Sequence, residues 1–485
     1  MPAKAPMASL VQDGSDDNFM VSRRYPSVFK LDVPRYMSKP AVFPDWYSFG
    51  LQRMHPWLEG DQKHVTGTHV DSFELTALQV QVALASGAAD CDVRLQEPPT
   101  AAAAGQGAQA PWPGSLKAPP TMDRPSSEDG AAVLASRILE GSSGSWQFDA
   151  FALAKATANR PLSALGVHLF DRLGLLKTFD LTRNKLSAFL QEVEKGYDDS
   201  NPYHNRAHAA SVLHAMHALL EHGGLMTVMA SVSGGEQGFG NSGNTEARTP
   251  QLQRMACLIA AAIHDYEHPG LSNDFLVKTG HQRAIRYNDQ HVNEHHHVSA
   301  AFDVLLRPEN NFLEHLPTDD LCKLRSLVVD LVLSTDMAQH FEIVQSARDV
   351  LSGVKSTNAA EVVKVGIESA WSREAHLLLK LAMKCSDLGH LALDWELHLQ
   401  WVQRLEEEFF RQGDKEKEAG LPLSFLTDRC KPGLSSSQVG FFDNVILPLF
   451  RLLAQVAPQA GLMLESVERN YQRWKDLEDP SAPGS

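Results

Sequence analysis

Three short segments of the sequence hold most of the residue types that could perform acid–base or metal chemistry. They are YHNRAH at 203–208, HDYEHPG at 264–270 and KCSDLGH at 384–390. Each segment places histidine or aspartate beside apolar residues with helical spacing. His264 and Asp265 follow directly on an apolar run, where a charged carboxylate is costly unless it meets a metal ion or another cation. This cost favours a cluster of metal ligands.

A mixed set of imidazoles and carboxylates without thiolates indicates which metals would fit. Histidine nitrogens suit zinc, and the oxygen-rich side of such a set suits a harder ion such as Mg²⁺ or Mn²⁺. Any one of these side chains alone would more often be a hydrogen-bonded core histidine or a helix-capping aspartate. The patterns HNxxH and HDxxHPG, together with the later Asp387, favour metal ligands, and a site with two different ions is compatible with this set.

The elements that must position these residues are predicted to be helices. Residues 186–193 place apolar side chains at i, i+3, i+4 and i+7, as an amphipathic helix does. A new helix is expected from the turn at Asn201-Pro202, with His204 and His208 four residues apart on one face. Further helical patterns cover residues 252–264, 298–306, 321–333, 376–385, 397–410 and 439–456. Strand signals are sparse in this part of the chain, so the predicted fold class is all-α.

Composition divides the chain into three predicted parts. Residues 98–134 are rich in Pro, Ala and Gly and cannot bury enough apolar surface to fold, which predicts a flexible linker. Residues 1–97 before it form a segment of unknown role, and residues 135–485 after it form the helical domain. Within that domain, the Gly- and Ser-rich residues 231–250 are expected to form an extended surface loop.

Charge and cysteine usage exclude several classes of protein. A formal net charge of −15 without a long basic run disfavours a nucleic-acid polymer as partner. The five cysteines lie far apart with no CxxC pair, which favours a reducing compartment. The longest apolar run, residues 255–263, is far shorter than the roughly 20 residues of a membrane span. The first residues, MPAKAPMASL, lack a signal-peptide core. A soluble, cytoplasmic protein without a membrane span is therefore expected.

The three segments resemble the catalytic domain of class I cyclic nucleotide phosphodiesterases. The resemblance covers residues 145 to 475 and includes WQFDAFALAKATANRPLSALG at 146–166, VLSTDMAQHF at 332–341 and SQVGFFD at 437–443. It implies a compact, all-α, multi-helix catalytic domain of the HD type, preceded by a poorly defined N-terminal segment. It also implies hydrolysis of 3',5'-cyclic nucleotides, cAMP or cGMP or both, to 5'-nucleotides, which terminates cyclic nucleotide signalling.

The resemblance also implies roles for single residues. His208, His264, Asp265 and Asp387 are expected to bind a zinc ion, and Asp265 is expected to bridge to a second ion, usually Mg²⁺ or else Mn²⁺. The two ions would share an activated hydroxide. His204 resembles the general acid, because the departing 3'-oxygen is a poor leaving group unless it is protonated. His204, Asp265 and Asp387 would also contact the substrate.

Further positions of the resemblance surround the metal centre or the base. In the family, the residues at His268, Asn273, Glu294 and Thr335 contact the ligands or metal-bound waters, although each could equally be a helix cap or turn residue.

Gln438 resembles the glutamine that hydrogen-bonds the purine, and Phe441 and Leu405 resemble the clamp around the base. Without the family, Phe441 and Leu405 would be ordinary core residues. An amide can present either its oxygen or its nitrogen, so the choice between cAMP and cGMP stays open.

The sequence resembles two subfamilies at once. His390 and the segment HHVSAA are similar to the calmodulin-regulated subfamily, whereas WQFDAFALAKATANRP is closer to a high-affinity, cAMP-specific subfamily. The stretch SRRYPSVFK at 22–30 has the basic and aromatic residues of a calmodulin site, but it is short and contains Pro26. A solvated surface segment is the favoured interpretation. Regulatory partners and a homodimer are left open.

Two other functions remain as alternatives. A helical HD-type phosphohydrolase that acts on dNTPs or alarmones would share the H…HD…D ligands, but it would not need Gln438, Phe441 and their SQVGFFD context. A cyclic-nucleotide-binding scaffold without catalysis would keep the pocket and lose ligands. All four ligand residues and the acid are present in this sequence, which disfavours the scaffold.

Overall fold

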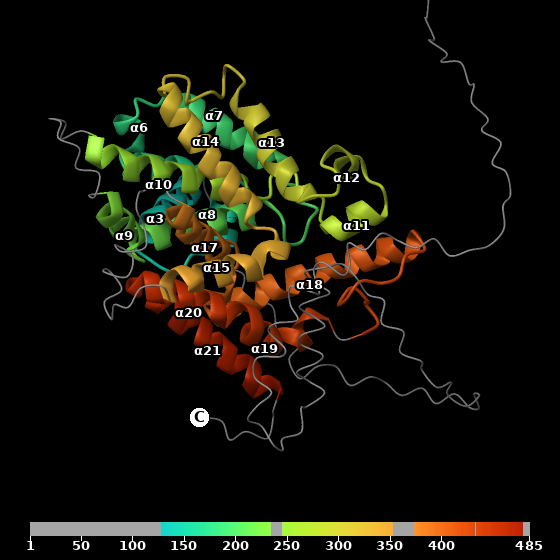
Figure 1. Ribbon diagram of the computed structural model, residues 1–485. Coiled ribbons are helices and arrows are strands. Elements are labelled where there is room, and N and C mark those ends of the chain that lie inside the picture. The colour runs from blue at the N-terminus through green and yellow to red at the C-terminus, as the bar shows by residue number, and fades with distance from the viewer. Residues whose placement is uncertain (1–127, 234–244, 353–372, 432, 479–485) are drawn as a thin grey trace, which may run out of the picture. The chain divides into compact units, whose positions relative to one another are not determined.

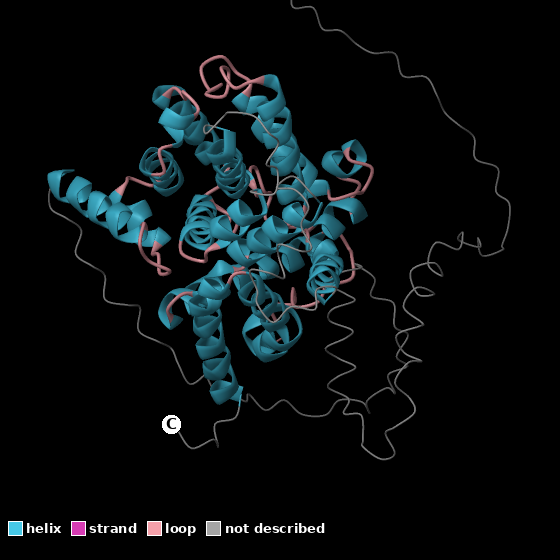
Figure 2. Ribbon diagram, turned by 60° about the vertical axis from the view of Figure 1, so that its left-hand side comes forward, coloured by secondary structure: helices cyan, strands magenta, loops and turns pink. Residues whose placement is uncertain are grey.

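In the computed structural model, the described residues are 128–233, 245–352, 373–431 and 433–478. Within these ranges every regular element is a helix, and Figure 2 shows no strand among them. The predicted all-α fold class is confirmed. The predicted segment 1–97, with its SRRYPSVFK stretch, lies outside the described residues.

The helices fall into three successive groups. The first comprises α3 (Glu128–Ser142), α4 (Ala150–Ala156), α5 (Pro161–Arg172), α6 (Leu175–Thr178), α7 (Arg183–Gly196), α8 (Arg206–Glu221) and α9 (Leu225–Ser233). The second comprises α10 (Thr245–Ile263), α11 (Asn273–Lys278), α12 (Gln282–Arg286), α13 (Val292–Leu305), α14 (Thr318–Leu333), the 3-10 helix η1 (Met337–Gln339) and α15 (His340–Ser352). The third comprises α17 (Arg373–Asp387), η2 (Gly389–Ala392), α18 (Trp395–Glu418), η3 (Leu434–Ser437), α19 (Gln438–Phe441), the π-helix η4 (Phe442–Ile446), α20 (Leu447–Val456), η5 (Pro458–Ala460) and α21 (Gly461–Glu478).

Helices α8 and α10 lie at the centre of the described fold. Side chains on nearly every side of α8 are buried, which is expected of a helix enclosed by other helices. Helix α8 contacts α5, α10 and α17, and α10 contacts α14 as well. Figure 1 shows α8, α10 and α17 between the α7–α14 group and the α18–α21 group. The three central helices therefore carry residues into the interior.

Two predicted boundaries differ from the structure. The predicted loop 231–250 is wrong at both ends, because α9 continues to Ser233 and α10 already begins at Thr245. Only residues 234–244 between them are outside the described part. Helix α3 begins at Glu128, inside the predicted linker, because its residues 135, 138 and 139 pack their apolar side chains on the core. The division into three parts otherwise stays a prediction.

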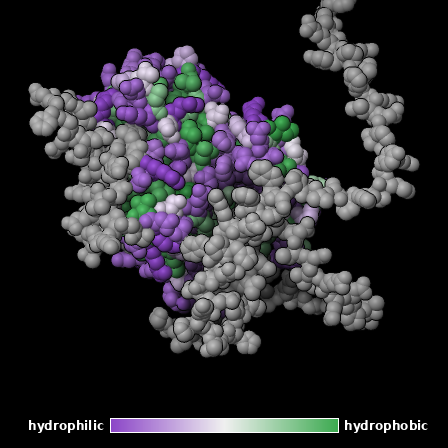
Figure 3. All heavy atoms as spheres, viewed as in Figure 1, coloured by the Kyte–Doolittle hydropathy of each residue, from purple (hydrophilic) through white to green (hydrophobic). Residues whose placement is uncertain are grey.

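One helical stretch, Leu434–Val456, is long and apolar enough to cross a membrane by length and composition. Half of its most apolar window is buried inside the fold, and a core helix passes the same test. The described residues therefore contain no clear membrane span. The part of the described surface that is visible in Figure 3 is largely hydrophilic, with smaller hydrophobic patches.

A buried carboxylate connects α7 to the start of α5. Glu194 is 2% exposed and accepts the backbone N–H groups of Leu162 at 2.7 Å and Ser163 at 3.2 Å. It also accepts the Ser163 hydroxyl at 2.6 Å. These N–H groups lie in the first turn of α5, where no partner exists within the helix. Burial raises the pKa of Glu194, and the hydrogen bonds counteract that cost only in part.

Replacing Glu194 should destabilise the fold. The Glu194→Ala variant leaves buried donors without a partner, so we expect its free energy of unfolding to fall by about 2–3 kcal/mol. Urea unfolding followed by circular dichroism measures this change. The control is Glu192→Ala on the same helix, whose side chain is 37% exposed and should change stability by less than about 0.5 kcal/mol. Equal unfolding midpoints for the two variants would refute the capping role.

Candidate active site

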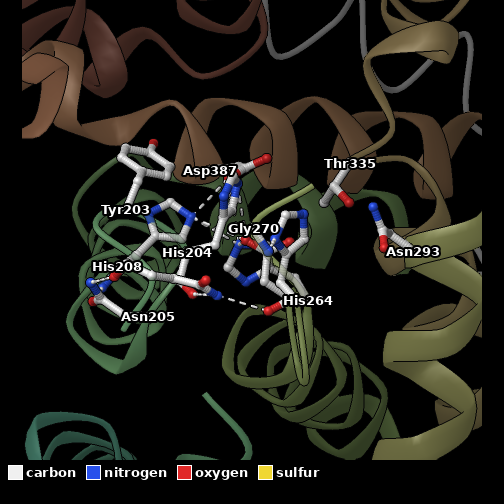
Figure 4. Close-up of polar contacts among 12 residues, drawn as sticks. Tyr203, His204, Asn205, His208, His264, Gly270, Asn293, Thr335 and Asp387 are labelled. Atoms are coloured by element: carbon white, nitrogen blue, oxygen red, sulfur yellow. Dashed lines mark hydrogen bonds and ion pairs between the residues drawn. The ribbon is translucent and has the colours of Figure 1, made fainter. Parts of the chain in front are cut away.

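Three central helices bring the four predicted ligand residues together. His208 lies in the first turn of α8, His264 and Asp265 directly follow α10, and Asp387 is the last residue of α17. One ligand atom from each residue lies within 4.8 Å of the others. Figure 4 shows Asp387 reaching from α17 toward His208 and His264.

The separations of these atoms match the shell of a metal ion. His264 Nε2 lies 3.0 Å from Asp265 Oδ2 and 3.2 Å from His208 Nε2. Asp387 Oδ1 lies 3.3 Å from His208 Nε2 and 3.4 Å from His264 Nε2. A zinc ion with ligands at 2.0–2.1 Å in a tetrahedron holds them about 3.3–3.4 Å apart. The two imidazoles and two carboxylates therefore fit one divalent cation in both chemistry and spacing.

The two carboxylates of the cluster are stabilised by positive charge on the neighbouring histidines. Burial alone would lower the pKa of His264, but the Asp265 and Asp387 carboxylates outweigh it and raise that pKa to about 10. Burial likewise opposes ionisation of the two carboxyl groups, yet the neighbouring histidines hold both of their pKa values below the usual range. A bound cation would supply the same positive charge without protons.

Hydrogen bonds fix the direction of the ligands. His264 Nδ1 donates to the Ala261 carbonyl at 3.0 Å, which leaves Nε2 free for a metal. The backbone N–H of Asp265 donates to the Tyr197 hydroxyl at 3.3 Å, and this hydroxyl donates to the Ala262 carbonyl at 3.0 Å. The ligands at the end of α10 are thus held by the backbone and by a buried tyrosine.

His204 precedes α8 rather than lying on it. The prediction that His204 and His208 share a helix face is wrong, because Asn205 is the N-cap residue with an extended backbone. Its side-chain oxygen accepts the N–H groups of Ala207 and His208, so the helix begins only at residue 206. The direction of His204 therefore depends on tertiary contacts and not on helical spacing.

Glu408 of α18 supplies those contacts. Its Oε2 accepts the backbone N–H groups of Tyr203 at 3.0 Å and His204 at 3.1 Å, and its Oε1 accepts from His204 Nδ1. The other ring nitrogen, Nε2, lies 3.9 Å from Asp265 Oδ2 at the ligand cluster. Burial lowers the pKa of His204, but Glu408 and then Asp265 outweigh it and raise the pKa to about 9. At neutral pH the ring therefore carries a proton that faces the cluster.

A second histidine stacks on His204. The rings of His204 and His268 lie 3.9 Å apart between centroids and 26° from parallel. Asn201 Nδ2 joins the two segments by donating to the carbonyls of His204 at 3.1 Å and His268 at 2.8 Å. Burial and the charge of His204 lower the pKa of His268 to about 3, so this ring is neutral.

A glycine is required beside this bridge. His268 Nδ1 accepts the N–H of Gly270, whose φ of +67° favours glycine. A Cβ at this position would lie 2.6 Å from Asn201 Oδ1 and displace the bridge.

The family of the chain follows from its sequence once this geometry is described. The sequence model of the 3'5'-cyclic nucleotide phosphodiesterase family matches residues 203–467, which is more than half of the chain. This protein belongs to the 3'5'-cyclic nucleotide phosphodiesterase family. The predicted resemblance is confirmed.

Curated relatives come from both subfamilies that the sequence resembles. The Drosophila melanogaster dual specificity calcium/calmodulin-dependent 3',5'-cyclic nucleotide phosphodiesterase 1 is 37% identical over 322 residues, covering 64% of this chain and 34% of the relative. The Mus musculus 3',5'-cyclic-AMP phosphodiesterase 4C is 34% identical over 339 residues, covering 70% of this chain and 46% of the relative. The chain therefore spans a third to about half of these relatives' length.

A solved structure supports the same fold. The crystal structure of the phosphodiesterase domain of Salpingoeca rosetta rhodopsin phosphodiesterase matches with a TM-score of 0.58 and 28% sequence identity. The match covers 72% of this chain and 96% of that domain. The helical catalytic-domain architecture of the family is thus present here.

Three other residues were predicted to lie near the metal centre: Asn273 and Glu294, which bind each other, and Thr335, which does not contact them through a hydrogen bond. Asn273 Nδ2 donates to Glu294 Oε2 at 2.9 Å. Burial and the nearby Asp336 carboxylate raise the pKa of Glu294 to about 8. The Thr335 hydroxyl donates to the Val332 carbonyl at 2.8 Å, as a residue after the end of α14 commonly does. Figure 4 places Thr335 to one side of the ligand cluster. Contacts of these residues with metal-bound water stay a prediction.

The predicted base-binding residues come from the third group of helices. Gln438 is 2% exposed, and its Nε2 donates to the Leu434 carbonyl at 3.1 Å. Its Oε1 is buried and has no hydrogen-bond partner. Phe441 and Leu405 are half-buried against the main core. Their role as a clamp around the base stays a prediction.

Sequence reasoning missed Glu408, although a signal was present. Residues 401, 405, 408 and 412 follow the spacing of one helix face, and the apolar Trp401 and Leu405 mark that face as buried. A glutamate in phase with such residues needs a partner. Asn201 gave no comparable signal, because an asparagine before proline is an ordinary turn residue.

Glu408 should control the proton affinity of His204. In Glu408→Gln the carboxylate charge is lost, so we expect the pKa of His204 to fall from about 9 toward its ordinary 6.5. Titration of histidine-labelled protein by NMR, in the presence of chelator, measures this directly. The neighbouring Glu407→Gln removes a carboxylate that pairs with Arg411 and Arg429, and it should leave His204 unchanged. An unaltered titration in Glu408→Gln would show that another group holds the proton.

Proposed function

We propose that this protein hydrolyses 3',5'-cyclic nucleotides, cAMP or cGMP or both, to 5'-nucleotides and so terminates cyclic nucleotide signals. The observation that carries the proposal is the convergence of four potential metal-ligand atoms, with Nε2 of His204 3.9 Å from Asp265 Oδ2 beside them. Family membership supports the substrate class. The separated cysteines favour a reducing compartment, so we propose that the protein acts in the cytoplasm.

The chain contributes the ligands and their orientation. His208, His264, Asp265 and Asp387 would hold a zinc ion, and Asp265 would also hold a second ion, Mg²⁺ or Mn²⁺. Such ions, when bound, lower the pKa of water and stabilise the charge on the attacking and leaving oxygens of a phosphoryl displacement. The hydrogen-bonded ring of His264 and the buried backbone of Asp265 keep the ligand set in place before substrate arrives.

His204 would protonate the leaving group. The Glu408 carboxylate holds Nδ1, and the stacked ring of His268 restricts rotation, so Nε2 presents its proton toward the ligand cluster. The 3'-oxygen of the ribose would take this proton as its bond to phosphorus breaks. Glu408 then stabilises the charged ring before transfer and orients the neutral ring after it. Asn273, Glu294 and Thr335 would bind water near the ions.

Gln438 would recognise the purine. The Leu434 carbonyl occupies its Nε2, so its free Oε1 would accept an N–H from the base. Adenine offers its exocyclic amine and guanine offers its ring N–H, so either base can satisfy this oxygen. Phe441 and Leu405 would contact the two faces of the base. The proposal therefore includes both cAMP and cGMP.

Substitution of a metal-ligand residue should reduce both metal binding and the hydrolysis of cyclic nucleotides. We expect the wild type to convert cAMP or cGMP to the 5'-nucleotide with Mg²⁺ and to stop after chelation. Asp387→Ala should lose bound metal and at least a hundredfold of its activity, because charge stabilisation depends on the ions. The control Asp394→Ala changes an exposed carboxylate that caps nothing with its side chain.

Metal analysis and chromatography of the products decide between the alternatives. Consumption of dGTP with both cyclic nucleotides intact would favour the HD-type phosphohydrolase. Metal-loaded protein that binds cyclic nucleotides without hydrolysing them would be the scaffold. Full activity of Asp387→Ala would refute the ligand assignment.

The acid role of His204 predicts a dependence on the leaving group. His204→Ala should slow cAMP or cGMP hydrolysis by about 10²–10⁴-fold, because the 3'-oxygen must be protonated. A nitrophenyl phosphodiester has a leaving group that departs without a proton, so its hydrolysis should fall less than about tenfold. His315→Ala is the control, since that side chain is 63% exposed. Equal losses for both substrates would assign His204 to binding or folding instead.

A further inference from the structure

Pro448 interrupts an otherwise continuous helical run from Gln438 to Val456. Helices α19, η4 and α20 follow one another without a break. A proline inside a helix has no N–H, and its ring clashes with the carbonyl four residues earlier, here that of Asn444. The chain forms a π-turn before the proline, in which the Leu447 N–H donates to the carbonyl of Phe442, five residues back. The proline therefore accounts for the wide turn.

The π-turn changes the direction in which α19 presents its side chains. One residue more than an α-helical turn rotates the preceding segment by about 100° and shifts it by about 1.5 Å relative to an unbroken helix. Helix α20 contacts α15, α17 and α21, whereas α19 contacts η3 and α21. Figure 1 shows α19 and α20 as neighbours beside α21. Two parts of one run thus face different surroundings.

Side chains stabilise the turn on both sides. Asn444 Nδ2 donates to the Gly440 carbonyl at 2.8 Å, across the junction of α19 and η4. The ring of Phe442 is fully buried and stacks on Tyr471 of α21 at 5.7 Å between centroids. The register of α19 is therefore held in one position.

That register places an unsatisfied acceptor in a buried position. Gln438 is the first residue of α19 and is 2% exposed. Its Nε2 is bound to the Leu434 carbonyl, and its Oε1 has no partner. Buried acceptors without a partner are rare in native proteins, and each one needs a reason such as a ligand.

We propose that Pro448 is a positioning residue for the nucleotide base. Through the π-turn it sets the rotation of α19 and so directs the Oε1 of Gln438 and the ring of Phe441 toward the substrate. The role of these two side chains rests on the proposed function. The ligand residues lie on or beside α8, α10 and α17, whereas α19 makes its main contacts with η3, η4 and α21, so a rotation of α19 is expected to leave the ligand residues in place.

Two variants of the full chain test the proposal. Pro448→Ala permits an unbroken α-helix, and deletion of Asn444 removes the additional residue of the turn directly. We expect both to weaken binding of cAMP and cGMP at least tenfold, measured as the Kd in chelator, and to raise KM similarly. The kcat and the metal content should stay within about twofold of wild type. Pro458→Ala, at the start of η5, is the matched control.

The outcomes separate this proposal from the proposed function. A crystal structure of each variant shows whether residues 442–447 have become α-helical. Wild-type binding by a variant that has lost its π-turn would overturn the role of the register, and a π-turn that persists in Pro448→Ala would overturn the role of the proline. Loss of kcat and metal along with binding would make Pro448 a general structural residue. Tight binding without hydrolysis by the wild type would instead refute the phosphodiesterase activity and leave this inference intact.

Discussion

Two carboxylates beside the core impose the main constraint on this structure. Asp265, just after α10, is buried, and Asp387, the last residue of α17, is half-buried, so that isolated negative charges at these positions would be costly. Two imidazoles face them at 3.0–3.4 Å and hold their pKa values low. The convergence of α8, α10 and α17 is what brings these four groups within ligand distance. The packing of these three helices therefore both forms the core and assembles the four potential metal ligands.

A second charged pair sits beside the cluster and serves a different purpose. His204 and Glu408 neutralise one another, so the protonated ring can remain next to the cluster without adding net charge to it. The pair also closes the turn before α8, because the same carboxylate accepts two backbone N–H groups. Loss of the Glu408 carboxylate would thus affect both the local backbone and the proton affinity of His204. The neighbouring Glu407, which pairs with Arg411 and Arg429 instead, is therefore the comparison.

The sequence predicted those features that local patterns determine. The patterns HNxxH and HDxxHPG, with a later aspartate, indicated a metal cluster on helices, and the family resemblance implied its members His208, His264, Asp265 and Asp387. His204 was predicted to lie on the helix, but Asn205, a strong N-cap residue, starts that helix only at residue 206, four residues after Pro202. Glu408 lies some two hundred residues further along the chain, so only tertiary packing joins it to His204. The ends of α9 and α10 within residues 231–250 were not predicted. Glycine-rich composition lowers the helix propensity of this stretch, but packing against the core determines where the two helices end.

Under the proposed function, substrate selection and the chemical step fall on different helices. The predicted ligand residues lie on or beside the three central helices, whereas Gln438 lies on the short helix α19, which is followed by the π-turn before Pro448. In that proposal, substitutions beside Gln438 would change which purine is accepted and leave the four ligand residues in place. Relatives named for dual specificity and for cyclic AMP alone both match this chain, and the proposed function accordingly includes both nucleotides. The Oε1 of Gln438 is buried without a hydrogen-bond partner, and both purines offer an N–H that would satisfy it. If Gln438 binds the base as proposed, discrimination between adenine and guanine would come from the groups around the remaining edge of the base.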